Sequence, residues 1–282
     1  MRVFGLLPLF LSLPLLAATE LTTRIHDIDY GQKPGDEVLV FLSSGHVAKL
    51  RESNQFLLTD AKTIDKKSWF RVTMDDERFI TSVDEVEAPI KEESKPTFKA
   101  LSEGPQSYVP TTIASMELAQ KYHREARYYE KDSQCFNRAQ VWTYEWWKKH
   151  SLKSMKILIF FTRTYIRRYN FEWWFHIAPY VHVMENGKVV ERVMDIKYTN
   201  GPRDFQKWAN IFLRNDHPCP VITKFSEYAD YPYTGECYFQ RTQMYTYQPA
   251  DLQMYEAWNY KKTNWNMTEV RWAYEEAFNE SI

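Results

Sequence analysis

Residues 173–196 read WWFHIAPYVHVMENGKVVERVMDI, and this stretch decides the fold. Its centre, residues 185–188, reads Glu-Asn-Gly-Lys between two runs that are rich in aromatic and β-branched residues. Asn-Gly between two such runs is the strongest short signal for a β-hairpin, because both turn positions accept a positive φ. The sequence therefore predicts two antiparallel strands, at 173–184 and 189–196.

The register that this turn imposes selects a histidine. Asp195 becomes the diagonal neighbour of His176 on the same face of the hairpin, about 7–8 Å away by backbone and within reach of the side chains. His182 instead falls opposite Glu191, well away from Asp195. Pro179 could introduce a bulge, and a slip of one residue would turn the strand over. The hairpin thus favours a pair of His176 and Asp195.

Helices are expected on both sides of the hairpin. Thr111 or Thr112 can cap a helix that runs to about residue 129, because apolar residues recur there at helical spacing. Further helices are predicted at 135–149, 204–213, 249–260 and 268–278, and a further strand at 156–162. Helices followed by an antiparallel sheet indicate an α+β fold.

The N-terminal part has the pattern of a small all-β domain at 19–87. Short strand-like runs occur at 37–42, 46–50, 55–59, 69–74 and 78–83, which suggests a small barrel of SH3 type. Residues 88–110 are rich in Lys, Glu and Ser and contain four prolines, a composition typical of a linker. The remaining 111–282 would form the second domain, ending in a helical extension.

Residues 1–18 have the features of a secretory signal peptide. Arg2 is positive, the following residues to Leu16 are apolar apart from Ser12, and Ala17-Ala18 offers small residues for cleavage. The apolar run of about 14 residues is shorter than the roughly 20 that span a bilayer. We expect a bacterial protein that a Sec-type signal sends to the periplasm or the medium, with no stable membrane insertion after cleavage.

The composition excludes several classes of function. The 282 residues include 36 Lys+Arg and 37 Asp+Glu, and the net charge of −1 provides no field to attract nucleic acid. No G-x-G-x-x-G, P-loop, C-x-x-C or H-E-x-x-H motif occurs, so neither a cofactor nor a metal is expected. His176, His182 and Asp195 could in principle hold a metal, but no motif supports this. Aromatic residues make up 16% of the chain and are expected mainly in the core.

The three cysteines divide into a pair and a single residue. Cys219 and Cys237 lie 18 residues apart and are expected to pair in an oxidising compartment. A disulfide that closes a loop of this length would stabilise the fold by about 3 kcal/mol. Cys135 stays unpaired at the start of the helix predicted at 135–149, where free backbone N–H groups and the helix dipole stabilise a thiolate. A buried structural residue and a nucleophile are both open at this point. A thiol nucleophile needs a histidine and an orienting carboxylate, for which His176 and Asp195 are the candidates.

Four short motifs follow one another between Cys135 and Cys237. They read CFNRA at 135–139, FHIA at 175–178, RVMD at 192–195 with Gly-Pro at 201–202, and CPVITKFS at 219–226. In this order they resemble the motifs of the protein-glutaminase family, secreted bacterial enzymes that deamidate glutamine side chains in proteins. The resemblance covers a little over a third of the chain.

The resemblance implies a catalytic triad of Cys135, His176 and Asp195 in a papain- or transglutaminase-like core, with the nucleophile helix packed on an antiparallel sheet. It implies a hydrolase acting on linear amides, which would deamidate glutamine in a protein or peptide substrate through a thioester and without a cofactor. In the family an N-terminal pro-region blocks the cleft, so residues 19–87 are a candidate pro-domain. A substrate-binding or targeting module that stays attached is the alternative.

Several further residues are weaker candidates for the site. The backbone N–H of Cys135 is expected as one oxyanion donor, and Gln134 is a candidate for the second. Arg138 lies one helical turn after the cysteine and is expected to support the helix rather than to touch substrate. Trp173 and Trp174 could wall the acyl site, although core packing is the commoner role of such residues.

Two other functions remain open on this evidence. A transglutaminase-like or peptidase-like enzyme would use the same triad, with a lysine amine as acceptor or a backbone amide as substrate. A non-enzymatic secreted binding protein would use the many aromatic side chains as a recognition surface and would not need Cys135.

Overall fold

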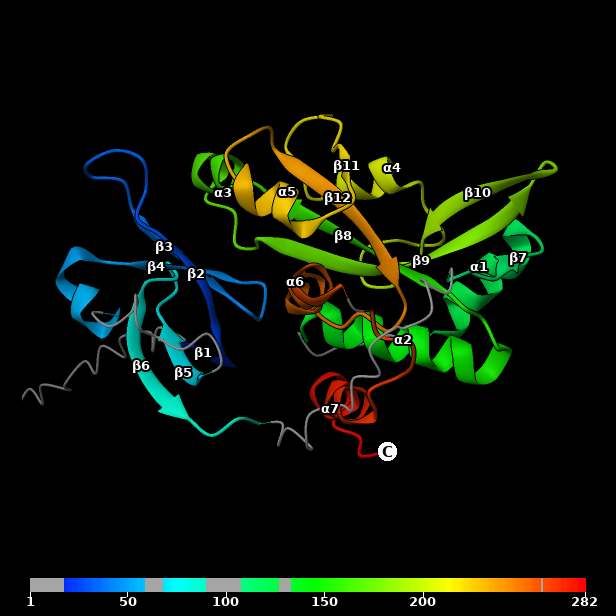
Figure 1. The fold of residues 1–282 in the computed structure, drawn as a ribbon, viewed down its shortest axis with the longest axis horizontal. Helices are drawn as coiled ribbons and strands as arrows, with labels where there is room; N and C mark the ends of the chain where they lie inside the picture. The colour runs from blue at the N-terminus through cyan, green and yellow to red at the C-terminus, as the bar shows by residue number, and fades with distance from the viewer. Residues whose placement is uncertain (1–17, 59–67, 90–107, 127–132, 260) are drawn as a thin grey trace, which may run out of the picture.

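The structure, a computed structural model, describes residues 18–58, 68–89, 108–126, 133–259 and 261–282. Most of the expected signal peptide and linker therefore lies outside the described residues. Within these ranges the chain is a mixed α+β fold with three sheets (Figure 1), which confirms the fold class at that level. No helix in the described part of the chain is both long enough and apolar enough to cross a membrane.

The largest sheet has six strands and carries the candidate site. Its path is β10 (Lys188–Val193), β9 (Phe175–Glu185), β8 (Met155–Phe161), β12 (Cys237–Gln243) and β11 (Val221–Ile222), with β7 (Thr112–Ile113) paired to β9. Neighbouring strands are antiparallel except β11 with β12 and β7 with β9, which are parallel.

The predicted hairpin is confirmed together with its register. Strands β9 and β10 pair without a shift, and His182 lies opposite Glu191. Asn186 and Gly187 form the turn with φ angles of 49° and 75°, the positive values that an Asn-Gly turn provides. The pairing of β9 with β10 ends at Tyr180 and Val193, and β8 pairs with β9 through Pro179 without a shift, so no bulge turns His176 away from Asp195.

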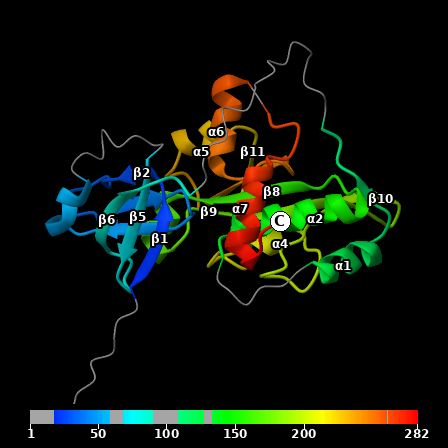
Figure 2. The same cartoon turned by 90° about the horizontal axis from the view of Figure 1, so that it is seen from below.

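Helix α2 (Cys135–His150) packs against β9, and α7 (Met267–Phe278) covers the side of α2 that faces away from the sheet (Figures 1 and 2). All residues of α2 from Phe136 to Trp146 are buried, because the helix is enclosed on both sides. Ser151 ends the helix in the left-handed conformation, and its N–H bonds to the carbonyl of Trp147 at 2.9 Å.

Five shorter helices complete the second part of the chain. They are α1 (Met116–Glu125), α3 (Arg163–Tyr169), α4 (Phe205–Ala209), α5 (Phe225–Asp230) and α6 (Pro249–Trp258). Adjacent side chains of β9 show which helices share a face. The ring of Phe175 stacks on Phe136 of α2, whereas the ring of His176 packs on Trp208 of α4. Since successive side chains of a strand point to opposite faces, α2 and α4 lie on opposite faces of the sheet.

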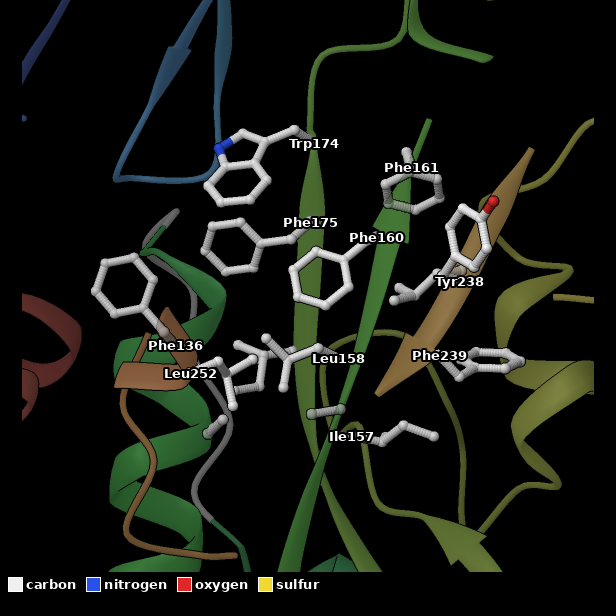
Figure 3. Close-up of a cluster of buried hydrophobic side chains, with 14 of the residues drawn as sticks. Phe136, Ile157, Leu158, Phe160, Phe161, Trp174, Phe175, Tyr238, Phe239 and Leu252 are labelled. Atoms are coloured by element: carbon white, nitrogen blue, oxygen red, sulfur yellow. The ribbon is translucent and has the colours of Figure 1, made fainter. Parts of the chain in front are cut away.

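Aromatic residues fill the space between α2 and the sheet. Figure 3 shows Phe175 of β9 between Phe136 of α2 and Phe160 of β8, with Trp174 above them. All four side chains are at most 1% exposed. These buried rings account for part of the high aromatic content as core packing, where each contributes a large apolar area.

The N-terminal part forms two three-stranded antiparallel sheets. One contains β1 (Thr19–Thr23), β5 (Trp69–Met74) and β6 (Ile80–Val86), and the other contains β2 (Ile25–Asp29), β3 (Val38–Leu42) and β4 (Val47–Leu50). They enclose a core of their own, which includes Val40, Val72 and Ile80.

Strand β3 joins this core to that of the large sheet, because both of its faces are buried. Val38, Val40 and Leu42 belong to the N-terminal core, whereas Leu39 and Phe41 belong to the core around the large sheet.

Four predicted elements were wrong in type or extent. The strand expected at 189–196 ends at Val193, so Asp195 lies beyond the pairing with β9. The strand expected at 55–59 is replaced by the 3-10 helix Glu52–Leu58, in which only Leu58 is buried, so the segment has no alternating apolar face to place on a sheet. The helix expected from residue 111 begins at Met116, because Thr112 and Ile113 pair with β9 and Ser115 is the N-cap. The helix expected at 204–213 has only five residues, Phe205–Ala209.

Candidate active site

Cys135 is the first residue of α2, as the sequence predicted. Gln134 precedes it with extended backbone angles, φ −71° and ψ 144°, and is the N-cap residue. The first N–H groups of a helix have no partner within the helix, and they carry the positive end of its dipole. Cys135 is half-buried and is the free cysteine of the chain. The thiol thus lies where a thiolate is stabilised.

His176 and Asp195 meet at the end of the hairpin. His176 is the second residue of β9, and the pairing of β9 with β10 ends at Val193, two residues before Asp195. The Nε2 atom of His176 lies 2.7 Å from Oδ2 of Asp195. The two residues are 2% and 1% exposed, so this contact is closed to water. With Nε2 bonded to Asp195, Nδ1 is the nitrogen left for the thiol.

The charges of this group of residues are coupled. Burial alone would raise the pKa of the Cys135 thiol, but the charge and hydrogen bond of the His176 ring, the Arg138 guanidinium and the backbone N–H of Ile177 hold that pKa below its ordinary value. Burial would lower the pKa of His176, yet the carboxylate of Asp195 and the thiolate raise it to about 9. Both shifts favour a thiolate beside an imidazolium over the neutral pair.

Asp195 is held as an anion by several groups. Burial would raise its pKa, but the charge and hydrogen bond of His176, a hydrogen bond from Trp208 and the charge of Arg138 together lower it. Its backbone is fixed as well, because the N–H and the hydroxyl of Thr199 both donate to the carbonyl of Asp195 at 2.9 Å. The carboxylate thus keeps one position and one charge.

Gln134 and Arg138 flank the thiol. The side chain of Gln134 makes no capping hydrogen bond. Arg138 is 4% exposed and its Nη1 donates to the carbonyl and the hydroxyl of Ser133, which precedes the helix. Arg138 thus links Ser133, before the helix, to the first turn of α2. Its positive charge also lowers the pKa values of Cys135 and Asp195.

The two tryptophans before His176 have different surroundings. Trp174 is 1% exposed, its indole N–H donates to the carbonyl of Leu42 at 2.8 Å, and its ring stacks on His26, so it is a core residue. Trp173 is half-buried, and its ring stacks on that of His176 with a centroid distance of 5.8 Å. Of these two tryptophans, only Trp173 lies where it could line the site.

The other two cysteines form the disulfide Cys219–Cys237, which links the segment before β11 to the first residue of β12. Among the residues that the structure describes, no group of three His, Cys, Asp or Glu side chains could hold a metal ion. His182 lies 4.0 Å from Glu191, far along β9 from the pair of His176 and Asp195.

Three neighbours of His176 were not predicted from the sequence. The rings of Tyr198, Trp208 and Phe212 lie 5.2, 5.6 and 4.8 Å from the imidazole, centroid to centroid. Trp208 also donates its indole N–H to Asp195 Oδ2 at 2.9 Å. All three follow Asp195 in the chain by 3 to 17 residues, and nothing in their local spacing marks them as part of a site.

Residues 111–212 match the family model described as glutaminase. No curated protein matches the chain. Among solved structures, pro-protein-glutaminase has a TM-score of 0.49 at 13% identity and covers 82% of this chain and 84% of its own. A mutant of pro-protein-glutaminase has a TM-score of 0.50 at 13% identity, covering 82% of this chain and 85% of its own.

The likeness to the mutant structure concerns the fold alone, because the identity is so low. The family match adds the sequence evidence, since it includes Cys135, His176 and Asp195 within its bounds. The resemblance to the protein-glutaminase family that the motifs predicted is therefore confirmed over residues 111–212, which match the family model.

Proposed function

We propose that this protein deamidates glutamine side chains of proteins or peptides, with Cys135, His176 and Asp195 as the catalytic triad. The observation that carries the proposal is the half-buried thiol at the start of α2 beside the buried pair of His176 and Asp195, within a segment that matches the glutaminase family. A surface-recognition protein would have no need of a thiolate kept beside a buried imidazolium.

The proposed first step uses the thiolate and imidazolium as they stand. The Cys135 sulfur attacks the carbonyl carbon of the glutamine side-chain amide, Cδ, and a tetrahedral intermediate forms with its negative charge on oxygen. The His176 Nδ1–H gives its proton to the amide nitrogen, the C–N bond breaks, and ammonia leaves a thioester behind. General acid assistance of this kind is worth about 10²–10⁴ in rate.

The proposed second step restores the enzyme. The neutral imidazole of His176 removes a proton from water, the hydroxide adds to the thioester carbon, and the Cys135 thiolate departs to leave glutamate. Asp195 keeps the proton of the ring on Nε2 and stabilises the imidazolium in both steps. The backbone N–H of Cys135 at the start of α2 is the proposed oxyanion donor, with the side chain of Gln134 as the candidate for a second.

We further propose export through the signal-like residues 1–18. The disulfide Cys219–Cys237 supports this, because such bonds persist in oxidising compartments. Residues 19–87 remain a candidate pro-domain.

The test is ammonia release from a glutamine-rich protein, measured for the parent protein and for Cys135→Ala, each before and after proteolysis within 88–110. We expect release from the parent and a loss of at least about 10⁴-fold in Cys135→Ala, since loss of a thiol nucleophile removes the covalent path. Arg168→Ala is a matched control on α3, where Arg168 pairs with Glu236. No release from any form, while Cys135 still reacts with a thiol reagent, would refute the proposal.

The same samples separate the alternatives. Incorporation of a labelled primary amine into the substrate protein would indicate transamidation, and new substrate fragments would indicate proteolysis. Deamidation predicts ammonia release with neither.

A further inference from the structure

Trp208 is a buried residue whose one polar atom points at the candidate triad. It lies on α4 and is fully buried. Its indole Nε1–H donates to Asp195 Oδ2 at 2.9 Å, and the same oxygen accepts from His176 Nε2 at 2.7 Å. Its ring also packs on the imidazole at 5.6 Å. One side chain thus contacts both partners of the pair.

The chemistry of the indole decides where the proton between His176 and Asp195 lies. An indole N–H donates and cannot accept, so an Asp195 oxygen that faces it has to be an acceptor. A proton on that oxygen would meet the N–H of Trp208. Trp208 therefore favours the ionised carboxylate and leaves the proton on Nε2 of His176. Nδ1 is then directed to Cys135.

The position of Trp208 is itself fixed by contacts of the residues before α4 and of its first turn. Before the helix, Val193 and Arg203 exchange two backbone hydrogen bonds of 2.7 and 2.9 Å, which tie this segment to the end of β10. Within the helix, Gln206 accepts from the backbone N–H of Cys219 at 3.2 Å. Cys219 is in turn held by its disulfide to Cys237. The donor is thus anchored to the sheet and to the disulfide.

We infer that Trp208 is a positioning residue of this site, which holds Asp195 ionised and aligned and so sustains the thiolate of Cys135. This inference rests on the proposed function. Other groups also act on the pair, and they come from α1, α2 and the turn after Asp195: His123, Cys135, Arg138 and Tyr198.

The test is the rate at which iodoacetamide alkylates Cys135, followed against pH in Trp208→Phe. Phenylalanine keeps an apolar ring but has no donor, so the Asp195 carboxyl is free to turn and its pKa rises. His176 then holds its proton less firmly, and the thiolate forms only at higher pH. We expect the acid limb of the profile to move up by about one to two pH units, as the loss of a hydrogen bond to a charged group implies.

Phe212→Leu is the matched control. Phe212 packs on the same imidazole at 4.8 Å but donates nothing to Asp195, so this change removes ring packing alone. Its alkylation profile should keep the parent's acid limb. Equal shifts in both variants, or a Trp208→Phe profile that overlays that of the parent, would overturn the inference.

A measurement on the parent protein covers the case in which Trp208→Phe does not fold. In protein labelled with ¹⁵N-tryptophan, one indole N–H should resonate far downfield and exchange slowly, and Asp195→Ala should remove that signal. Its persistence in Asp195→Ala would refute the contact. Neither measurement needs a glutamine substrate. A shifted alkylation limb in a protein that releases no ammonia would therefore refute the proposed function and leave the role of Trp208 standing.

Discussion

Cys135 owes its proposed reactivity to the charges beside it. It is half-buried, which alone would favour the neutral thiol, yet the neighbouring imidazolium, the Arg138 guanidinium and the N–H of Ile177 reverse that preference. Asp195 in turn keeps His176 protonated. The reactive group is therefore an ion pair of sulfur and imidazole rather than a lone cysteine.

This ion pair predicts the pH dependence of deamidation. The pKa of His176 is raised to about 9, so the ring loses its proton as the pH rises through about 9. The departing ammonia then has no acid to protonate it. The pKa of Cys135 is lowered, so the rate falls on the acid side only below the ordinary range of a thiol. We expect a bell-shaped pH profile of the initial rate of ammonia release, with its basic limb near pH 9 and its acid limb below the ordinary range of a thiol.

Alkylation of Cys135 serves as the control for that profile. The thiolate persists above pH 9, so alkylation should keep its plateau where ammonia release declines. In Asp195→Asn the basic limb of ammonia release should move to lower pH, because His176 loses the charge that raises its pKa. A basic limb of the parent near pH 7 would contradict the assignment.

At the scale of elements, the nucleophile helix α2 is held in place by the C-terminal segment. The hydroxyl of Tyr247 hydrogen-bonds to Oδ1 of Asn137, two residues after the thiol, and both side chains are buried. Trp272 of α7 packs on Phe136. Lys156 of β8, fully buried, donates both to Gln140 of α2 and to the carbonyl of Thr246, and so joins α2 to the C-terminal segment. The extension beyond the glutaminase match thus supports the start of α2.

Tyr247→Phe should therefore affect both stability and the thiol. Loss of the hydroxyl leaves the Asn137 oxygen without its buried donor, which costs about 1–3 kcal/mol of unfolding free energy. We also expect slower alkylation of Cys135, because the first turn of α2 loses a fixed contact. Tyr238→Phe removes a hydroxyl that bonds to Thr234 away from α2, so it should lower stability in urea unfolding without changing the alkylation rate. The same alkylation rate in both variants would contradict this role.

The disulfide Cys219–Cys237 gives a second prediction at the scale of elements. Cys219→Ala with Cys237→Ala should lower the free energy of unfolding by about 3 kcal/mol, the entropy estimate for a loop of this length. The loss should be visible as a lower midpoint in urea. Reduction of the parent with dithiothreitol should have the same effect, whereas Cys135→Ala should leave the midpoint sensitive to dithiothreitol. An unchanged midpoint after reduction would mean that the loop is held by packing alone.

At the scale of the whole molecule, ion pairs and backbone hydrogen bonds bind the N-terminal unit to the rest of the chain. Arg163 and Arg167 of α3 pair with Asp27 and Asp29 of β2, the second pair at 2.7 Å with an Asp29 side chain that is 4% exposed. Backbone hydrogen bonds also connect the two parts. The N–H of Val47 donates to the carbonyl of Glu172 at 2.8 Å, and the N–H of Trp174 donates to the carbonyl of Gly45 at 3.0 Å.

Arg78 extends the same interface. It donates to the carbonyls of Asn170 and Phe171 at 2.8 and 3.1 Å. These contacts adjoin the beginning of β9, where His176 lies. Together with strand β3, which belongs to both cores, these contacts join residues 19–86 to the rest of the chain by packing and hydrogen bonds.

We therefore expect the two parts to stay together after proteolysis within 88–110. Burial would raise the pKa of Asp29, but hydrogen bonds from Arg167, Tyr233 and Gly31 hold it below 3.8. A lowered pKa means that the attraction is complete above the ordinary value of 3.8 and is lost as the pH falls through the lowered value. Size-exclusion chromatography of the cleaved protein should show co-elution at pH 7 and separation in strong acid.

Arg167→Ala should weaken that association, because it leaves the Asp29 carboxylate buried without its partner. Lys121→Ala, which removes an exposed ion pair to Glu125 on α1, is the control and should elute as the parent does. Separation of the cleaved parent at pH 7 would show that the covalent link holds the unit in place.

The sequence by itself determined the hairpin, its register and the start of the nucleophile helix. Those features are local: an Asn-Gly turn sets the pairing of neighbouring residues, and a helix start depends on a few adjacent positions. That is why the pair of His176 and Asp195 could be selected from one chain, and the separation of the cysteines likewise suggested the disulfide.

The tertiary structure decided what surrounds those residues. Trp208 reaches Asp195 through a helix of five residues whose own pattern is too short to be read, and the 3-10 helix at 52–58 has no periodicity that distinguishes it from a strand. Strand β3 is buried on both faces because two different cores meet there. Contacts between distant segments depend on the packing of whole elements, and no local spacing in the chain encodes them.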